Sequence, residues 1–159
     1  KDITLLKGGI PAQFGGRLSS LLDVRMKDGN ANSFHGNGGI GLISSRLTLE
    51  GPVQKDKSSF IISGRRTYAD LFLKLSKNED LQNSQLYFYD LNLKTNYRIN
   101  EKNRIYLSGY FGRDVFGFND QLGIDWGNVT GTLRWNHLFS DRLFLNSSLI
   151  SLVGWVDHI

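Results

Sequence analysis

Residues 100–118 read Asn-Glu-Lys-Asn-Arg-Ile-Tyr-Leu-Ser-Gly-Tyr-Phe-Gly-Arg-Asp-Val-Phe-Gly-Phe, and this stretch decides the fold. From Arg104 onward the residue types alternate between two sides of the chain. One side carries Ile105, Leu107, Gly109 and Phe111, and the other carries Tyr106, Ser108, Tyr110 and Gly112. A period of two predicts a β-strand whose two faces meet different surroundings.

The preceding stretch, residues 87–99, alternates even more regularly. Tyr89, Leu91, Leu93, Thr95, Tyr97 and Ile99 alternate with Asp90, Asn92, Lys94, Asn96 and Arg98. The polar residues 100–103 separate the two strands, so together they predict a long β-hairpin.

Further strands are predicted on both sides of this hairpin, at residues 18–27, 34–41, 42–49, 59–68, 126–139 and 142–155. In the strand 126–139 we expect Val129, Gly131, Leu133 and Trp135 to point outward, and Thr130, Thr132, Arg134 and Asn136 to point inward. Turns are predicted at 51–57, with the short connection itself at 54–57, and at 140–141. Longer connections are predicted at 69–85, with a short helix over 69–75, and at 119–125.

Two classes of β protein fit this pattern. Strands longer than is usual in soluble sheets, short turns that alternate with longer loops, and polar inward faces favour a transmembrane β-barrel. A soluble antiparallel sheet with one wet face produces the same alternation, so a soluble ligand-binding barrel and a small structural or adhesive outer-membrane barrel stay open.

The composition limits the partners of the chain. The net charge is +4, from 19 basic and 15 acidic residues spread evenly, and this does not indicate nucleic-acid binding. The absence of cysteine excludes disulfides and thiolate metal sites. No apolar run reaches the roughly 18 residues of a membrane-spanning helix.

No enzyme chemistry is predicted. The Gly-x-Gly-x-x-Gly spacing at 36–41 is followed by a strand, whereas dinucleotide binding needs a helix at that point. His35, His137 and His158 have no acids at metal-ligand spacing, and no nucleophile arrangement is recognisable. We therefore expect no catalytic residue, metal or cofactor. The aromatic run 87–89 fits either ligand stacking or an aromatic girdle.

Residues 6–27 read Leu-Lys-Gly-Gly-Ile-Pro-Ala-Gln-Phe-Gly-Gly-Arg-Leu-Ser-Ser-Leu-Leu-Asp-Val-Arg-Met-Lys. This segment resembles the end of the plug domain of TonB-dependent outer-membrane receptors, and the match rests on Lys7, Gly8, Gly9, Gly15, Gly16 and Arg17. Residues 44–52 resemble the barrel start of Bacteroidetes-type members. Lys7 departs from the Arg of many members, and Gly9 replaces a frequent Pro.

The resemblance implies an all-β fold, in which an antiparallel meander forms part of a large transmembrane β-barrel after the end of a plug domain. Residues 1–30 would be the C-terminal part of the plug, and residues 31–159 about the first seven strands of the barrel, with a tight outer turn near residues 40–42. The chain would then be a fragment of a receptor in the bacterial outer membrane.

The resemblance also implies a function and partners. The function is energised uptake of a siderophore, cobalamin, glycan or peptide, without enzymatic activity or a cofactor. The partners are outer-membrane lipid, the nutrient, an inner-membrane energising complex that binds a segment upstream of this chain, and a surface lipoprotein as a further candidate. Nucleic acid is not among them.

An ionic contact is expected between the plug segment and the barrel. Lys7 and Arg17 of the plug segment would pair with inward acids of the barrel, such as Glu50 or Asp90, because a closed lumen must satisfy its charges. The alternative is that these lumen charges are solvated and form no lock.

Overall fold

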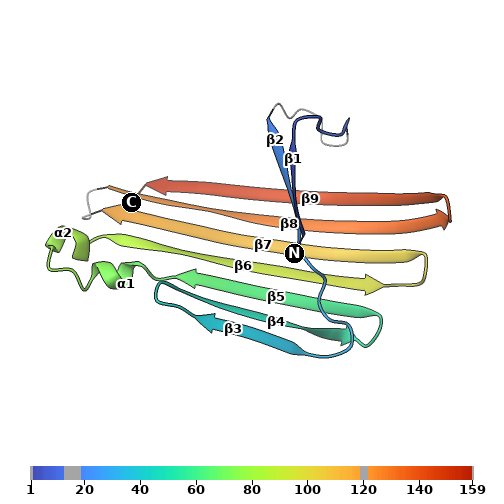
Figure 1. The fold of residues 1–159 in the computed structure, drawn as a ribbon, viewed down its shortest axis with the longest axis horizontal. Coiled ribbons are helices and arrows are strands. Elements are labelled where there is room, and N and C mark those ends of the chain that lie inside the picture. The colour runs from blue at the N-terminus through green and yellow to red at the C-terminus, as the bar shows by residue number, and fades with distance from the viewer. Residues whose placement is uncertain (1, 13–18, 119–121, 159) are drawn as a thin grey trace.

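The computed structural model describes residues 2–12, 19–118 and 122–158. Two antiparallel sheets make up the fold (Figure 1). The smaller sheet pairs β1 (Asp2–Lys7) with β2 (Ser20–Arg25). The larger sheet has seven strands in sequence order: β3 (His35–Ile40), β4 (Ser44–Gln54), β5 (Ser58–Thr67), β6 (Gln85–Arg98), β7 (Asn103–Phe118), β8 (Leu122–Ser140) and β9 (Leu143–His158). The expected all-β, antiparallel fold is confirmed.

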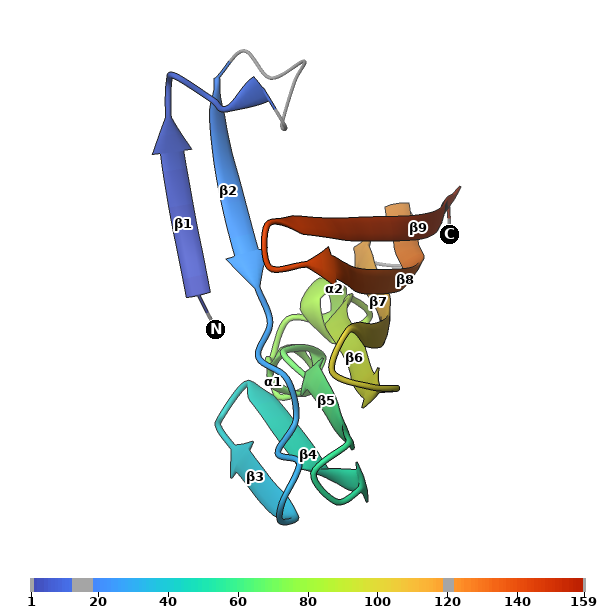
Figure 2. The same cartoon turned by 90° about the vertical axis from the view of Figure 1, so that its right-hand side faces the viewer.

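The strands β6 to β9 are long, with lengths of 14, 16, 19 and 16 residues. Each strand of the large sheet pairs with its neighbours in the sequence, so the sheet is a simple meander. It is not closed, because β3 and β9 lie at its two edges. Figure 2 shows that the sheet is curved and that the β1–β2 hairpin stands on its concave side.

Two short helices lie in the connection between β5 and β6. The first, α1 (Asp70–Leu73), falls within the helix predicted at 69–75, whereas α2 (Glu79–Gln82) was not predicted. No helix in the described part of the chain has the length and hydrophobicity needed to cross a membrane.

Two of the predicted connections are wrong in part. Residues 122–125 are not loop but the start of β8, where Leu122 pairs with Phe118 and Asp125 with Val115. The remainder of that predicted loop, residues 119–121, lies outside the described residues. Residues 51–54 are strand and not turn, because β4 continues to Gln54 through an irregularity in the ladder between Pro52 and Gln54. The short connection predicted at 54–57 agrees with the structure, in which β5 begins at Ser58. In both places cross-strand pairing overrides local turn-forming residues.

The register of the ladders sorts side chains onto two faces of the large sheet. The apolar face contains Leu47, Leu49, Phe60, Ile62, Leu91, Leu93, Thr95, Ile105, Leu107, Phe111, Val129, Leu133, Leu149 and Val153. The polar face contains Glu50, Ser63, Asn92, Lys94, Asn96, Tyr106, Ser108, Thr130, Thr132, Arg134, Asn136, Asn146 and Ser148. The separation is weakest in β9, where Ile150 and Leu152 lie on the polar side.

The sheet has almost no hydrophobic core of its own. Val115 is the single apolar side chain that is buried among the described residues, with 3% of its surface exposed. On the apolar face Leu133 is 46% exposed and Leu149 is 72% exposed. A folded sheet in water normally buries such a face against a second layer, which this part of the chain does not supply.

Candidate functional site

The apolar face carries a continuous uncharged band across β4 to β9. Its rows follow the register: Leu91 pairs with Phe111, and Phe111 with Val129. On β6 the uncharged band extends from Leu91 to Tyr97, and the row of Tyr89, which also holds Arg66 and Arg113, borders it. From Tyr89 to Tyr97 the distance is about 27 Å along a strand that rises ~3.4 Å per residue. A strand tilted by about 40°, as in transmembrane barrels, would span roughly 20 Å across the membrane, close to their apolar bands of about 25 Å.

Aromatic rings border this band at both ends. At the end with the long β5–β6 connection, the rings of Tyr89, Phe111 and Trp155 form a chain with centroid separations of 5.8 and 6.0 Å. At the opposite end, the ring of His137 lies 5.5 Å from Trp135 and 4.3 Å from Phe139. Aromatic rings of this kind mark the two membrane interfaces in transmembrane barrels.

Among the described residues, charged side chains reappear on this face at the first of these borders, in the row of Tyr89 and in the rows that follow it. Arg66 lies opposite Tyr89 in the ladder and 5.9 Å from the ring centroid of Tyr87. Arg113 donates through Nε to both oxygens of Asp125, at 2.9 and 3.0 Å. The side chain of Asp125 is only 6% exposed, so the guanidinium compensates for a carboxylate that is largely removed from water.

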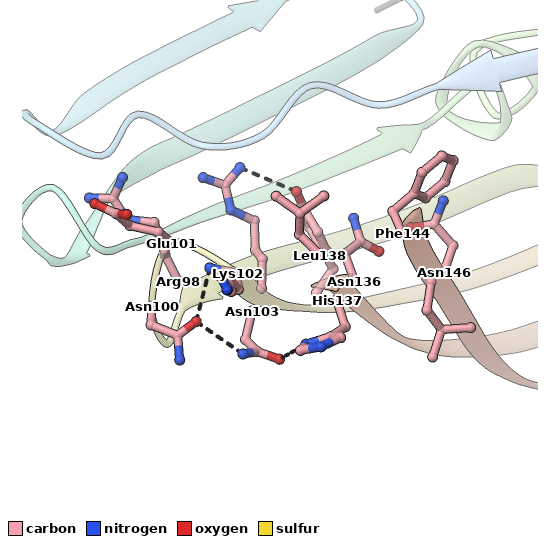
Figure 3. Close-up of a pocket in the computed structure, with 13 residues that line it drawn as sticks. Arg98, Asn100, Glu101, Lys102, Asn103, Asn136, His137, Leu138, Phe144 and Asn146 are labelled. Carbon is pink, nitrogen blue, oxygen red and sulfur yellow. Dashed lines mark hydrogen bonds between the residues drawn. The ribbon is translucent and has the colours of Figure 1, made fainter. Parts of the chain in front are cut away.

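The turn at the other end fixes the aromatic border through amide side chains (Figure 3). Asn100 Oδ1 accepts hydrogen bonds from the backbone N–H of Lys102 and from Asn103 Nδ2, both at 3.0 Å. Asn103 Oδ1 in turn accepts one from Trp135 Nε1 at 3.1 Å and lies 2.7 Å from His137 Nδ1. The β6–β7 turn thereby orients the rings of the neighbouring strand.

The polar face holds the segment that follows β2. Residues 26–31, which we call the docking segment, connect the β1–β2 hairpin to the large sheet. Lys27 Nζ lies 2.6 Å from Glu50 Oε1 on β4, and Asp28 Oδ1 lies 2.7 Å from Lys94 Nζ on β6. The two consecutive charges of the segment are therefore each matched by the opposite charge on the sheet.

These two sheet residues lie in one row of the ladder. Glu50 pairs with Ile61, and Ile61 pairs with Lys94. Of the two lysines in these ion pairs, Lys94 is better shielded from water than Lys27, with a side chain that is 19% exposed. Lys94 also donates to the carbonyl of Met26 at 2.9 Å. The segment is thus held across three strands by both side-chain and backbone contacts.

The backbone of the docking segment also approaches the sheet closely. A Cβ atom on Gly29 would lie 2.0 Å from the carbonyl oxygen of Phe60, so only glycine fits there. Two residues later, the carbonyl of Ala31 accepts a hydrogen bond of 3.2 Å from the N–H of Asp56. Asp56 itself has a φ of 62°, which the tight β4–β5 turn requires.

The residues of the predicted plug motif are only partly described. Lys7 ends β1, and Gly8 and Gly9 follow it with φ values of 71° and 55°, the left-handed region that favours glycine. Gly15, Gly16 and Arg17 lie outside the described residues.

The two acids expected to meet the plug segment have other partners in the described part of the chain. Glu50 pairs with Lys27, which belongs to the same N-terminal segment as Lys7, and Asp90 pairs with Arg65 of β5 at 2.7 Å. A contact of Lys7 with either acid does not occur there, and a contact of Arg17 stays a prediction.

Sequence reasoning missed Lys27, Asp28 and Lys94 as contact residues. A signal was present, because Lys27 and Asp28 are consecutive opposite charges that immediately precede a glycine. Their partners could not be identified, since the path of the docking segment over the sheet is not encoded in any local pattern.

The described residues contain no group of three His, Asp or Glu side chains that is arranged to hold a metal ion. Comparison with protein-family models, with curated proteins and with solved structures found no match for this chain.

Proposed function

We propose that this chain is part of a TonB-dependent outer-membrane receptor, in which the large sheet belongs to a transmembrane β-barrel and the N-terminal hairpin belongs to the plug. One observation carries the proposal: an exposed, uncharged band lies between two aromatic borders, on the face opposite the docked N-terminal segment. In water such a band would be a large aggregation-prone surface, whereas lipid chains would cover it.

The polar face supports the same proposal. In a barrel this face lines the lumen, where charged and amide side chains contact water or a plug. The docking segment reaches that face through the pairs Lys27–Glu50 and Asp28–Lys94, as expected for a chain that leaves a plug and enters the barrel wall. The receptor would take up a nutrient and would have no enzymatic activity.

The open edges β3 and β9 also fit a place within a larger sheet. An isolated sheet with long, exposed edge strands would pair with other chains. In a closed barrel every edge is paired, and no backbone N–H or C=O meets lipid.

The proposal is tested by locating the native protein in cells. An epitope tag in the connection between β5 and β6 follows it through separation of inner and outer membranes and through gel electrophoresis with and without boiling. We expect it in the outer-membrane fraction, with a faster-migrating folded form that boiling abolishes. Recovery in the aqueous fraction without detergent would instead favour a soluble β-barrel.

A further inference from the structure

Three arginines gather on the polar face at the end with the short turns. Arg98 on β6 lies directly opposite Arg104 on β7. Arg134 on β8 lies directly opposite Tyr106, two residues along β7 from Arg104. Directly opposed side chains have Cβ atoms about 5 Å apart, and diagonal neighbours about 7–8 Å apart, so the three arginines occupy neighbouring positions of the ladder.

None of these arginines is paired with a carboxylate in the part of the chain that the structure describes. Arg98 Nη2 donates to a backbone carbonyl, that of Asp56, at 2.7 Å. Arg104 Nη1 donates to the hydroxyl of Tyr106 at 3.3 Å. Like charges directly opposed across a ladder are destabilising, so the cluster has an unfavourable energy unless an anion joins it.

The acids that line the two clefts around these arginines are engaged elsewhere or lie in a turn. Asp23 and Asp28 line the same cleft as Arg134, but Asp23 pairs with Arg25 at 3.0 Å and Asp28 pairs with Lys94. Glu101 belongs to the β6–β7 turn and is exposed. The positive charge of the cluster therefore stays largely uncompensated.

Tyr106 lies at the centre of this basic area. Its ring centroid is 5.9 Å from Lys94 Nζ, and its hydroxyl accepts from Arg104. Two clefts meet around it, one at the turn (Figure 3) and one beneath β2, and Tyr106, Asn136 and Asn146 line both. Arg134 and Lys94 line the cleft beneath β2, which has a volume of about 610 Å³, enough for a small organic ligand. Arg98 and Arg104 line the cleft at the turn, which has a volume of about 270 Å³, so a ligand that contacts all three arginines extends across both clefts.

We propose that Arg98, Arg104 and Arg134 form a binding site for a ligand that carries two or more oxyanion groups, carboxylate or phosphate. Guanidinium groups bind both through paired N–H donors, and several groups at this spacing favour a multivalent anion over a single one. Asn136 and Asn146 supply neutral hydrogen-bonding groups at the junction of the two clefts. The site goes beyond the proposed uptake function and indicates that an anionic ligand or partner contacts the polar face at this end.

The test is calorimetric titration of the native protein that carries this chain, extracted from the membrane into detergent micelles, with tricarballylate as a carboxylate probe and pyrophosphate as a phosphate probe. The double variant Arg104→Gln, Arg134→Gln removes two guanidinium groups. The control Lys55→Gln, Arg142→Gln removes the same charge from turns at the same end of the sheet. A third variant, Arg104→Lys, Arg134→Lys, keeps the charge and removes the planar forks.

We expect saturable binding of at least one probe, and the preferred probe distinguishes a carboxylate ligand from a phosphate ligand. Binding should weaken by about tenfold or more in the Gln variant and clearly in the Lys variant, because charge-assisted bidentate hydrogen bonds are lost. The control should bind like the unaltered chain.

Three results would overturn the site. The first is that neither probe binds the unaltered chain. The second is that binding weakens equally in the control variant. The third is that the Lys variant binds with unaltered affinity, which would indicate that a diffuse positive field attracts the probe. If the Gln variant does not fold, the affinities of the Lys variant and of the control variant for the probes test the site instead. The measurement takes place in detergent, so its failure leaves the membrane location of the sheet untouched.

Discussion

Lys94 and Asp28 form an ion pair, with 2.7 Å between Nζ and Oδ1, that joins the middle of the large sheet to the segment leaving the β1–β2 hairpin. The lysine side chain is only 19% exposed and also binds the carbonyl of Met26. Breaking this pair leaves a partly desolvated ammonium group without its carboxylate, which is the costly way to disrupt such a contact.

Asp28→Asn should therefore loosen the docking segment. Because Asp28 is itself partly exposed, we expect a loss of about 1 kcal/mol in the free energy of docking, measured as faster amide hydrogen exchange over residues 26–31. Asp23→Asn is the control, since its pair with Arg25 lies within the hairpin. The exchanged pair Asp28→Lys, Lys94→Asp should restore only part of the slow exchange, because an aspartate at position 94 cannot donate to the carbonyl of Met26. Failure of the single variant to change exchange would show that backbone contacts alone hold the segment.

Gly29→Ala should displace the docking segment from the sheet. The added methyl would lie 2.0 Å from the carbonyl oxygen of Phe60, and neither backbone can move freely. We expect destabilisation of about 2 kcal/mol, as for other overpacked sites, measured by urea unfolding in detergent. Gly131→Ala is the matched control, because its added methyl meets no atom within 4 Å. Equal stability of the two variants would contradict the observed path of the segment.

Asp125→Asn should destabilise the pairing of β7 with β8. The carboxylate accepts two hydrogen bonds from Arg113 Nε, and its side chain is 6% exposed, so the neutral amide leaves an arginine without its counter-charge. We expect a loss of about 3 kcal/mol in the free energy of unfolding. The double variant Arg113→Gln, Asp125→Asn should recover part of this loss; a double variant less stable than the single one would contradict an ion-pair origin.

The sequence predicted the long strands because the alternation at residues 87–99 and 104–118 is nearly unbroken. It failed at residues 122–125, where Gly123 and Asp125 favour a loop on local grounds. Asp125 is stabilised in the strand by Arg113, twelve residues earlier, and such a cross-strand partner carries no local signal.

The sequence predicted that the N-terminal segment forms an ion pair with the polar face, but it did not predict which residues form it. Lys7 or Arg17 was expected to pair with an inward acid such as Glu50 or Asp90. In the structure Glu50 pairs instead with Lys27, and Asp90 pairs with Arg65. The choice among lysines depends on where the backbone crosses the sheet, and this path is set by the close approach of Gly29 to Phe60.

In the proposed barrel, the apolar face of the large sheet contacts lipid and the polar face contacts water. These 159 residues contain no cysteine, so each single substitution adds one reactive thiol to this part of the protein. Leu107→Cys and Leu133→Cys probe the apolar face, and their sequence neighbours Ser108→Cys and Thr132→Cys probe the polar face.

The decisive measurement is the reaction of these four variants with a charged maleimide in native outer membranes, before and after detergent denaturation. We predict that positions 108 and 132 react in the intact membrane, and that positions 107 and 133 react only after denaturation. Rapid labelling at positions 107 and 133 in the intact membrane would mean that water covers the apolar face, and this result would contradict the transmembrane barrel.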